Sequence, residues 1–495
     1  MTDKKASVNA PLAKRYDVIV IGTGAGGSSL AYQLSQFGLR VLVLEQGDFL
    51  TSAIRKTSDS IGRYMFDIIN SRSDLAFVGG ETKFYGSALY RLYESDFLAV
   101  QHENGVSPAW PFPYTELEPY YESAERLYRV HGSSHDCGPR RAQPFPYPAI
   151  EHAPIIAKVV RRIENSDNKV SAIPLGLDYG PNGRCVLCST CDGHYCQIDA
   201  KMDAEVAALR PALAKRTTQL VTGVECVRVV TTKDGTGVAG VSVRYRGTKT
   251  EQVVDSDIVA VCAGVRRSVI LLRRSRTSKH PDGLGNNNGC LGRHLAGHSV
   301  GTIFPFVSWN RIPPVYTKTF SINSYYHGAQ DWPYPLGSIQ MAGQMPFWQE
   351  AQSPLRPLAR FVGKHALMCF FMTEALPTYD SKLIFDGDEI VGRVDPVHNV
   401  RSFLKLRKLA INVFRRAGYP VLARRRAPYV WHEVGTARLG NDPATSVVDP
   451  NCQAHGIKGL FVVDASVLPS AGALNTALTI VALGLRTGQY ISKTS

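Results

Sequence analysis

The chain has 495 residues, which is too long for one ordinary domain and suits two domains or one large α/β core with a substrate-binding elaboration. Apolar residues make up 44% and charged residues 20%, a globular composition that excludes a wholly disordered chain, collagen and a coiled coil. Lysine and arginine outnumber the acidic residues by 56 to 42, which gives a net charge of +14.

The basic residues are scattered in short groups, such as Arg273-Arg274 and Arg424-Arg425-Arg426, and none forms a long run interleaved with aromatic residues. We therefore expect a solvated basic surface and no nucleic acid partner. The alternative is that this charge attracts an anionic substrate or an acidic surface.

Residues 1–15 contain no apolar segment of the kind found in signal peptides. The most apolar stretch, residues 473–485, is shorter than the roughly 18 residues that span a membrane, and it contains one asparagine and two threonines. We expect a cytoplasmic protein with no membrane contact. Its ten cysteines are then thiols or metal ligands rather than disulfides.

The first predicted elements are a strand, a helix and a second strand near the N-terminus. Residues 16–21 form a short apolar, β-branched run typical of a buried parallel strand, and they lead into a GxGxxG sequence made by Gly22, Gly24 and Gly27. A helix over 28–37 follows, and a strand over 40–44 comes next. Gly22 permits a tight turn, Gly24 lets the backbone approach a pyrophosphate, and Gly27 lets the helix pack closely against the strand.

Glu45 ends the second strand, where a carboxylate accepts hydrogen bonds from the ribose hydroxyls of an adenosine. Its charge would repel the 2′-phosphate of NADP. The pyrophosphate would lie at the positive N-terminus of the helix. The strand, glycine motif, helix and terminal acid together predict a dinucleotide site, and these residues alone leave NAD and FAD open.

A second glycine segment runs from Gly79 to Ser87. Paired glycines, Gly79 and Gly80, precede a polar stretch, which suggests backbone amides that face a ligand. An ordinary turn is the alternative interpretation.

Four cysteines follow with the spacing C-x2-C-x2-C-x4-C, at Cys185, Cys188, Cys191 and Cys196. Four thiolates this close together could hold an iron–sulfur cluster or zinc. We favour a structural role, reduced or disulfide-paired, over a metal site.

Strand-like stretches recur through the middle of the chain. Alternating strands are expected over 224–230 and 240–245, and a buried strand over 257–262. Four further stretches have no helical pattern between them and predict an antiparallel sheet: 300–307, 336–341, 366–372 and 381–385. A helix with basic faces is expected over 402–417.

The C-terminal third carries a series of short motifs. They are Trp431-His432-Glu433-Val434-Gly435-Thr436, Asp442-Pro443, Val448-Asp449, Val463-Asp464-Ala465-Ser466 and Asn475-Thr476-Ala477, the last of which opens a helix. With the N-terminal glycine motif, this series resembles the glucose–methanol–choline (GMC) oxidoreductases, FAD enzymes that oxidise alcohols. The resemblance covers nearly the whole chain and implies FAD rather than NAD.

The resemblance assigns roles to single positions. His432 matches the family's catalytic histidine, and Asn475 matches its partner, which is His or Asn in different members. Asp464 matches an aspartate near the FAD ribityl chain and pyrophosphate. The segment after Asn475 would place backbone amides near the flavin C2 carbonyl.

The segment from Gly79 to Ser87 matches the stretch that passes the isoalloxazine ring. Phe84 stands where some members attach FAD covalently through a histidine, so we expect non-covalent FAD. Tyr85 stands where relatives often place an asparagine. The residues expected to contact the cofactor are Gly22, Gly24, Gly27, Glu45, Gly79, Gly80, Tyr85, Gly86, Ser87, Val224, Asp464, Ala465 and Thr476.

The resemblance also implies two discontinuous domains. A Rossmann-like, α/β FAD-binding domain would comprise residues 14–110, 200–300 and 430–495. A substrate-binding domain built on an antiparallel sheet would comprise residues 111–199 and 301–429. Some sugar-oxidising members carry an iron–sulfur cluster in roughly the region of the four cysteines, with a different spacing.

The predicted reaction is the oxidation of an alcohol group of a sugar, polyol or small biosynthetic alcohol to a carbonyl. A neutral imidazole, His432, takes the hydroxyl proton, the amide of Asn475 holds the oxygen, and the flavin N5 takes the hydride. Oxygen or another acceptor would reoxidise the flavin.

Two alternatives stay open at this point. One is a non-oxidative flavoenzyme on the same fold, a lyase or a decarboxylase. The other is a flavin electron-transfer module that uses the cysteines. His432 and Asn475 argue against the second, because an electron carrier needs neither.

Overall fold

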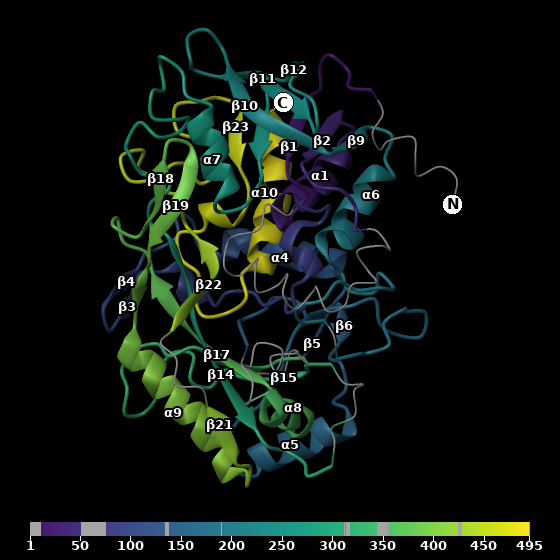
Figure 1. The fold of residues 1–495 in the computed structure, drawn as a ribbon, viewed down its shortest axis with the longest axis vertical. Coiled ribbons are helices and arrows are strands. Elements are labelled where there is room, and N and C mark those ends of the chain that lie inside the picture. Colours follow the sequence, from purple (N-terminus) through teal and green to yellow (C-terminus); the bar gives the residue numbers. More distant parts are fainter. Residues whose placement is uncertain are drawn as a thin grey trace.

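The computed structural model describes residues 11–50, 76–133, 138–189, 191–310, 312, 317–343, 354, 356–423 and 428–494. The arginine group 424–426 lies outside the described residues. A parallel sheet with its helices lies at one end of the molecule and a large antiparallel sheet at the other (Figure 1).

The parallel sheet has five strands in the order β23-β13-β1-β2-β9. They are β1 (Val18–Ile21), β2 (Val41–Glu45), β9 (Thr218–Thr222), β13 (Val259–Val261) and β23 (Leu460–Val462). β1 lies in the middle, and it pairs in parallel with β2 on one side and β13 on the other. Its four residues are all buried, because strands covered on both faces read as unbroken apolar runs.

Helices α1 (Ala25–Ser35) and α10 (Ala477–Thr494) pack against each other beside this sheet. α1 begins three residues earlier than the sequence predicts, directly after Gly24, and the chain then turns at Gly38 with φ of 75°. Two glycines of α10 allow the close approach: a Cβ on Gly484 would lie 2.9 Å from the Gly26 carbonyl oxygen, and one on Gly488 would lie 2.7 Å from Gln33 Cβ.

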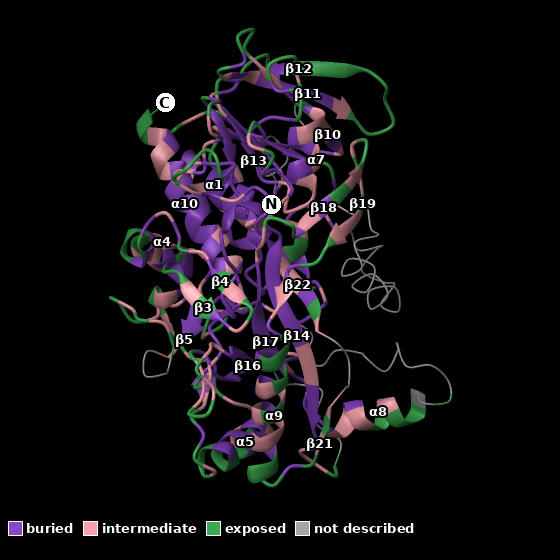
Figure 2. Ribbon diagram, turned by 90° about the vertical axis from the view of Figure 1, so that its left-hand side faces the viewer, coloured by how far each residue is buried: buried purple, intermediate pink, exposed green. Residues whose placement is uncertain are grey.

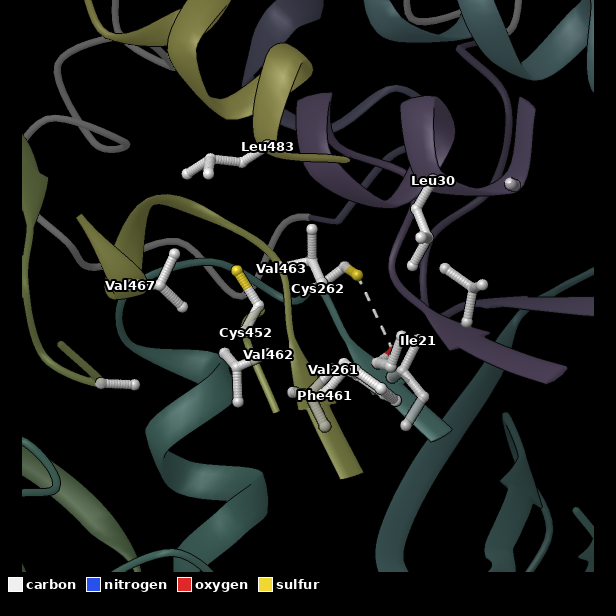
Figure 3. Close-up of a cluster of buried hydrophobic side chains, with 14 of the residues drawn as sticks. Ile21, Leu30, Val261, Cys262, Cys452, Phe461, Val462, Val463, Val467 and Leu483 are labelled. Atoms are coloured by element: carbon white, nitrogen blue, oxygen red, sulfur yellow. Dashed lines mark hydrogen bonds between the residues drawn. The ribbon is translucent and has the colours of Figure 1, made fainter. Parts of the chain in front are cut away.

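One continuous core joins the sheet to these helices (Figure 3). Ile21 of β1, Leu30 of α1, Val261 of β13, Phe461 of β23 and Leu483 of α10 all lie in it and are at most 6% exposed. Each such side chain contributes about 1.5–3 kcal/mol relative to an exposed one. The core therefore holds together strands that come from three separate stretches of the chain.

The antiparallel sheet has eight strands, and its main path runs β21-β14-β17-β16-β15-β7. These are β7 (Ser171–Ala172), β14 (Ala296–Pro305), β15 (Phe320–Ile322), β16 (Ser338–Met341), β17 (Cys369–Leu376) and β21 (Val421–Ala423). β20 (Val397–His398) pairs with β17, and β22 (Tyr429–Val434) pairs with β14. β14 and β17 form the longest ladder of the sheet, from Gly297↔Ala375 to Ile303↔Cys369, and both strands are mostly buried (Figure 2).

Helices α5 (Pro154–Glu164) and α9 (Val400–Arg416) cover this sheet. The buried residues of α9 include Phe403, Leu406, Ala410 and Val413, which recur at helical spacing along one face. The helix predicted over 402–417 is therefore present, with bounds shifted by one or two residues. The predicted fold class, a Rossmann-like α/β domain joined to a domain on an antiparallel sheet, is confirmed.

One predicted strand of the antiparallel sheet belongs elsewhere. β18 (Lys382–Asp386), expected over 381–385 in the main sheet, pairs with β19 (Glu389–Val394) in a separate hairpin. The reason is local: Gly387, with φ of 58°, supplies a two-residue hairpin turn directly after Asp386.

The other elements complete the description. A three-stranded antiparallel sheet comprises β10 (Val224–Thr231), β11 (Val238–Tyr245) and β12 (Glu251–Asp255). Smaller sheets comprise β3 (Val100–His102) with β4 (Gly105–Ser107), and β6 (Tyr147–Pro148), β5 (Val130–Gly132) and β8 (Leu175–Gly176). The remaining helices are η1 (Gly80–Lys83), η2 (Glu94–Phe97), α4 (Tyr114–Leu127), η3 (Glu205–Leu209), α6 (Arg210–Leu213), α7 (Arg267–Arg274), α8 (Arg356–His365) and η5 (Ala465–Val467). Within the described ranges, none of the helices combines the length and the apolar character that crossing a membrane requires.

Candidate active site

The three glycines of the GxGxxG motif lie in the turn between β1 and α1 and in the first turn of α1. Gly22 has φ of 101°, and a Cβ there would lie 2.4 Å from the Cys262 carbonyl oxygen. A Cβ on Gly27 would lie 2.1 Å from the Gly22 carbonyl oxygen. Among the residues that the structure describes, a Cβ on Gly24 would meet no atom within 4 Å beyond its chain neighbours, so the open space of the motif lies over Gly24. That space is where a pyrophosphate would approach the backbone.

A fourth glycine, Gly26, has a structural task that the GxGxxG pattern does not reveal. A Cβ on Gly26 would lie 1.9 Å from the carbonyl oxygen of Val463, the residue that follows β23. Gly26 therefore allows helix α1 to lie against the strand end that carries Asp464.

Glu45 lies at the carboxyl end of β2 and is held by two neighbours. Its Oε2 accepts hydrogen bonds from the Thr23 amide (3.1 Å) and the Thr23 hydroxyl, and its Oε1 accepts from the Gly47 amide (2.9 Å). Burial raises the pKa of Glu45, and these hydrogen bonds oppose that rise. The Gly79 amide donates to the Thr23 hydroxyl oxygen (3.0 Å). Thr23, which the sequence analysis did not single out, thus joins Glu45 to the second glycine segment.

Asp464 lies just beyond the end of β23 and organises the neighbouring loops. Its carboxylate accepts hydrogen bonds from the amides of Gly264 (2.9 Å) and Ser466 (2.8 Å) and from the Ser268 hydroxyl (2.5 Å). A Cβ on Gly264 would meet nothing within 4 Å, so open space adjoins this carboxylate as well.

Two other predicted cofactor contacts lie near these loops. Ala465 opens the short helix η5 directly after Asp464. Val224 is buried in the core, and the preceding Gly223 amide donates to the Gly47 carbonyl (3.2 Å), which places the start of β10 beside the turn after Glu45.

The segment from Phe84 to Ser87 is backed by the cysteine segment. The Gly193 amide donates to the Phe84 carbonyl (2.9 Å), and the ammonium of Lys201 donates to the Tyr85 carbonyl (2.9 Å). The Tyr85 hydroxyl donates to the Met202 carbonyl. The Ser87 hydroxyl donates to the Gly176 carbonyl, and Ser87 itself has φ of 61°. The polar atoms of both side chains are therefore turned toward protein carbonyls.

Lys201 ties the cysteine segment to this strip. It is 1% exposed, and its ammonium also donates to the carbonyls of Cys191 (3.1 Å) and His194 (2.5 Å). Burial lowers the pKa of Lys201 and raises that of Cys185 to about 11 and that of Cys191 to about 12. Among the residues that the structure describes, no group of three or more His, Cys, Asp and Glu side chains is arranged to hold a metal ion.

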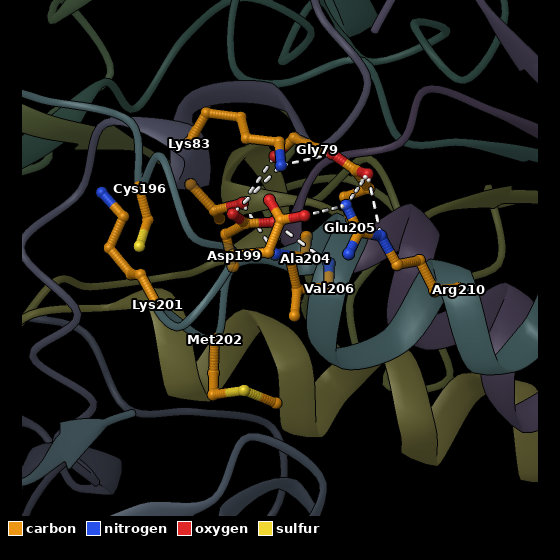
Figure 4. Close-up of polar contacts among 12 residues, drawn as sticks. Gly79, Lys83, Cys196, Asp199, Lys201, Met202, Ala204, Glu205, Val206 and Arg210 are labelled. Carbon is orange, nitrogen blue, oxygen red and sulfur yellow. Dashed lines mark hydrogen bonds and ion pairs between the residues drawn. The ribbon is translucent and has the colours of Figure 1, made fainter. Parts of the chain in front are cut away.

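A network of charged side chains lies next to Gly79 (Figure 4). Lys83 pairs with Asp203 (3.1 Å) and with Glu205, and Arg210 pairs with Glu205 (2.7 Å) and Asp199 (3.0 Å). A cavity of about 130 Å³ adjoins this network, and Phe49, Leu50, Tyr195 and Cys196 complete its lining. The carboxylates neutralise both cations, so the network supports the glycine segment without leaving a free charge on either of them.

His432 lies on β22 at an irregularity in its pairing with β14. Ala296 pairs with Val434 and His298 pairs with Trp431, so two residues of β22 face the single residue Gly297. This is a β-bulge, and His432 adopts φ of 52° within it. Gly297 makes room, because a Cβ there would lie 2.7 Å from the Trp431 carbonyl oxygen.

The bulge directs His432 toward His298, which the sequence analysis did not identify. The two Nδ1 atoms lie 2.9 Å apart, and His298 Nε2 lies 3.3 Å from the Ala471 carbonyl oxygen. His298 is completely buried, whereas His432 is partly exposed. Desolvation lowers the pKa of His432 to about 3, with smaller effects of His298 and Lys318, and burial lowers that of His298 to about 4. Both rings are therefore neutral at pH 7.

The loop from Ser470 to Asn475 is fixed by several distant side chains. Glu374 of β17 accepts hydrogen bonds from the Ala471 and Gly472 amides (3.0 and 3.1 Å), and its other oxygen lies 3.2 Å from His102 Nε2. The Trp110 indole donates to the Ser470 hydroxyl oxygen (3.0 Å). The Ala473 amide donates to the hydroxyl of Tyr326 (3.0 Å), which in turn donates to Asp96 (2.8 Å). Burial raises the pKa of Asp96 to about 7.

Asn475 follows this loop and precedes α10. Its side-chain oxygen is buried and has no hydrogen-bond partner among the described residues. Buried polar atoms are rarely left unpaired in native proteins, and each one calls for a partner. Thr476, next along the chain, leads into a helix N-terminus, where backbone amides have no partners within the helix. This end of α10 therefore offers donors and an acceptor to a ligand.

A buried ion pair completes the surroundings of the site. Lys318 and Asp192 lie 2.6 Å apart and are 6% and 8% exposed, and Asp192 also accepts from the Gly343 amide (2.6 Å). A Cβ on Gly86 would lie about 2 Å from both charged groups, so the pair lies directly against the backbone of the second glycine segment. No local sequence signal predicts this pairing, because its partners are separated by more than a hundred residues.

The fold and the site together define a two-domain, nucleotide-cofactor enzyme with a neutral histidine near the antiparallel sheet. The sequence models of the GMC oxidoreductases match residues 71–300 and 415–484, and that of an NAD(P)-binding Rossmann-like domain matches residues 20–69. The chain belongs to the GMC oxidoreductase family, which is FAD-dependent. It is an enzyme of the type that acts on alcohol groups.

Three relatives extend over nearly the whole chain. It is 29% identical to 6'''-hydroxyparomomycin C oxidase of Streptomyces lividus and 26% identical to paromamine 6'-oxidase of Streptomyces fradiae, in each case over 96% of this chain and 91% of the relative. It is 25% identical to 2-methyl-1,2-propanediol dehydrogenase of Mycolicibacterium austroafricanum, over 97% of this chain and 96% of the relative. The crystal structure of pyridoxine 4-oxidase from Mesorbium loti is similar with a TM-score of 0.65 and 18% identity, over 96% of this chain and 99% of that one, which shows a shared fold.

Proposed function

We propose that this protein oxidises an alcohol group of a sugar, polyol or small biosynthetic alcohol to a carbonyl, with His432 as the base and Asn475 as the group that holds the substrate oxygen. The observation that carries the proposal is that His298 contacts both the neutral, partly exposed imidazole of His432 and the carbonyl of Ala471. Ala471 lies four residues before Asn475, whose buried side-chain oxygen has no partner among the described residues. Bound FAD supplies the acceptor for the carbon-bound hydride.

His432 removes the hydroxyl proton, because a neutral imidazole has a free nitrogen that can accept it. The amide of Asn475 can hydrogen-bond to the substrate oxygen without competing as a base. Lys318, which disfavours a charged His432, helps to keep the imidazole unprotonated before the substrate arrives. The proton and the substrate are thus handled by this chain's own side chains.

We also propose that FAD binds non-covalently over the open space at Gly24. Glu45 would accept hydrogen bonds from the adenosine ribose, Asp464 would hold the ribityl chain and pyrophosphate, and Thr476 would contact the flavin. Phe84 supports non-covalent binding because its side chain has no nucleophilic atom. The remaining predicted contacts would contribute through their backbone or their packing. They are Gly22, Gly27, Gly79, Gly80, Tyr85, Gly86, Ser87, Val224 and Ala465. The proposed division assigns residues 14–110, 200–300 and 430–495 to the FAD-binding domain and residues 111–199 and 301–429 to the substrate-binding domain.

Two glycine variants test the cofactor site. A methyl group at Gly24 meets no protein atom, so Gly24→Ala should unfold in the apoprotein at the wild-type temperature but bind FAD more weakly. Gly26→Ala is the matched control, because its Cβ would overlap the Val463 carbonyl and should lower the melting temperature of the apoprotein itself. Thermal melts with increasing FAD separate the two effects. Unchanged FAD affinity in Gly24→Ala would remove this glycine from the site.

The relatives suggest which substrates to try. Two of them are named as oxidases of 6'''-hydroxyparomomycin C and of paromamine, and one as a dehydrogenase of 2-methyl-1,2-propanediol. We propose that amino sugars, sugars and short diols form the starting panel. Readmission of air after reduction distinguishes oxygen from another electron acceptor.

The decisive experiment is anaerobic absorbance spectroscopy of the FAD-loaded protein with this panel. Bleaching of the flavin by one alcohol supports the proposed reaction, and His432→Ala should slow that bleaching by about 10²–10⁴-fold while FAD stays bound. His280→Ala serves as control, because His280 is another buried histidine whose Nε2 contacts the Gly235 carbonyl (2.9 Å) in a loop of the β10–β11 region. Rapid bleaching in His432→Ala would refute the assignment of the base.

A further inference from the structure

The contact between His298 and His432 has a chemical consequence that neither residue has alone. Their Nδ1 atoms lie 2.9 Å apart, with ring centroids at 5.1 Å and an interplanar angle of 80°. In this edge-on arrangement one nitrogen must donate a proton and the other must accept it. Which ring donates is decided by what lies on the far side of His298.

The far side of His298 faces an atom that can only accept. His298 Nε2 lies 3.3 Å from the Ala471 carbonyl oxygen, and a carbonyl has no proton to give. Nε2 must therefore carry the proton of the neutral ring. His298 Nδ1 is then an acceptor, so the proton between the two rings belongs to His432 Nδ1.

A neutral imidazole has one N–H, so His432 Nε2 is left without a proton. We propose that His298 is a positioning residue that fixes His432 in the Nδ1–H tautomer and so makes Nε2 the nitrogen that receives the substrate proton. The inference rests on the proposed function, in which His432 is the base. It extends that function by naming the residue that prepares the base.

The arrangement fixes the orientation of His432, but it does not pass the substrate proton on through His298. After His432 Nε2 takes a proton, Nδ1–H still donates to His298, whose own proton points at a carbonyl that cannot accept it covalently. The proton therefore leaves from Nε2, on the side of the substrate. His298 acts as an anchor and not as a relay.

The same contact links the base to the loop of Asn475. Ala471 receives the His298 hydrogen bond on its carbonyl and gives its amide to Glu374 (3.0 Å). The charged groups that act on the two rings are Lys318 on His432 and Glu374 on His298. A shift of the Ala471 peptide would therefore change the position of His298 and, through it, that of the base His432.

Three substitutions separate the roles of the two ring nitrogens of His298. His298→Asn keeps an acceptor near the Nδ1 position and gives up the bond to Ala471. His298→Gln keeps a donor near the Nε2 position and gives up the acceptor for His432. His298→Leu removes both while preserving apolar volume.

We expect His298→Asn to stay within about tenfold of the wild-type rate of flavin reduction, and the Gln and Leu variants to lose about 10²-fold or more in kcat with little change in KM. Because His298 does not touch the substrate, a binding defect is not expected. Histidine ¹⁵N chemical shifts of the FAD-loaded protein read the tautomer of His432 directly, with His432→Ala used to assign the signal. The wild-type signal should be that of the Nδ1–H form, and the Gln and Leu variants should lose it.

Two results would overturn the inference. The first is a wild-type His432 in the Nε2–H form, and the second is rescue by Gln but not by Asn, which would show that the bond to Ala471 matters instead. Neither result touches the proposed function, which falls only if His432→Ala reduces its flavin at the wild-type rate. If all three His298 variants fail to bind FAD, the wild-type tautomer alone still decides the inference.

Discussion

Replacement of Gly297 by alanine should damage the active site without touching any catalytic atom. Gly297 is the single residue that faces the two-residue bulge of β22, and its missing side chain leaves space for the bulged backbone. A Cβ at this position would lie 2.7 Å from the Trp431 carbonyl oxygen and 3.1 Å from that of His432. These two carbonyls belong to the peptides on either side of His432, which would have to move away from β14 and take His432 with them.

The size of the effect can be worked out from these distances. Ordinary van der Waals contact begins beyond about 3.4 Å, so the backbone must yield by several tenths of an ångström at two atoms. Overpacking of this kind costs about 1–3 kcal/mol of stability. A displacement of about 1 Å at a reacting group can cost about 10²-fold in rate. We therefore expect kcat to fall by one to two orders of magnitude, more than the loss of stability alone would explain.

A second glycine of the same strand provides the control. A Cβ on Gly301 would lie 2.2 Å from the Phe371 ring, so Gly301→Ala overpacks the sheet at a site away from the bulge. Urea unfolding should show similar losses of stability for Gly297→Ala and Gly301→Ala, and anaerobic flavin reduction should be slow in the first alone. Equal rates in the two variants would show that the geometry of the bulge does not set the position of His432.

Two further predictions concern charge. In the folded protein the pKa of His298 is about 4 and that of His432 is about 3, against an ordinary value of 6.5, so the unfolded chain binds more protons between these values. The free energy of unfolding should therefore fall as the pH is lowered from about 6.5 toward 4. Urea titrations at several pH values measure this fall, which should be shallower in His298→Asn. Lys318→Met should destabilise the protein by about 3–5 kcal/mol because it leaves Asp192 buried and unpaired. The double variant with Asp192→Asn should recover most of that loss. Simple additivity of the two single effects in a double-mutant cycle would contradict a coupled pair.

The sequence predicts those parts of the fold whose patterns lie in consecutive residues. The first strand, the glycine motif, the helix and Glu45 follow from an apolar run, from glycine spacing and from one terminal acid, and they lie within 30 residues of one another. The hairpin of β18 and β19 was misplaced even though its signal is local. Gly387-Asp388 between two strand-like stretches is a two-residue hairpin turn, and greater weight on that turn separates β18 from the main sheet.

The parts of the site that the sequence does not predict depend on long-range register. His432 and Asn475 could be named from motifs, but the bulge that aims His432 exists only because β22 pairs with β14 across more than a hundred residues. In the sequence His298 is one histidine just before a predicted strand, and no neighbouring residue indicates that its ring contacts His432. The same holds for Lys201, whose three carbonyl partners become neighbours only when the cysteine segment folds against the second glycine segment.

The β14–β17 ladder sets the relative positions of the two proposed reacting groups. His432 is carried by β22 on β14, and the loop before Asn475 is held by Glu374 of β17, so both proposed reacting groups are fastened to one pair of adjacent strands. The dinucleotide sheet supplies the cofactor but not the spacing of these two groups. The protein should therefore keep its acid–base apparatus preassembled when it is stripped of FAD, so that reconstitution is the docking of a cofactor onto a finished site.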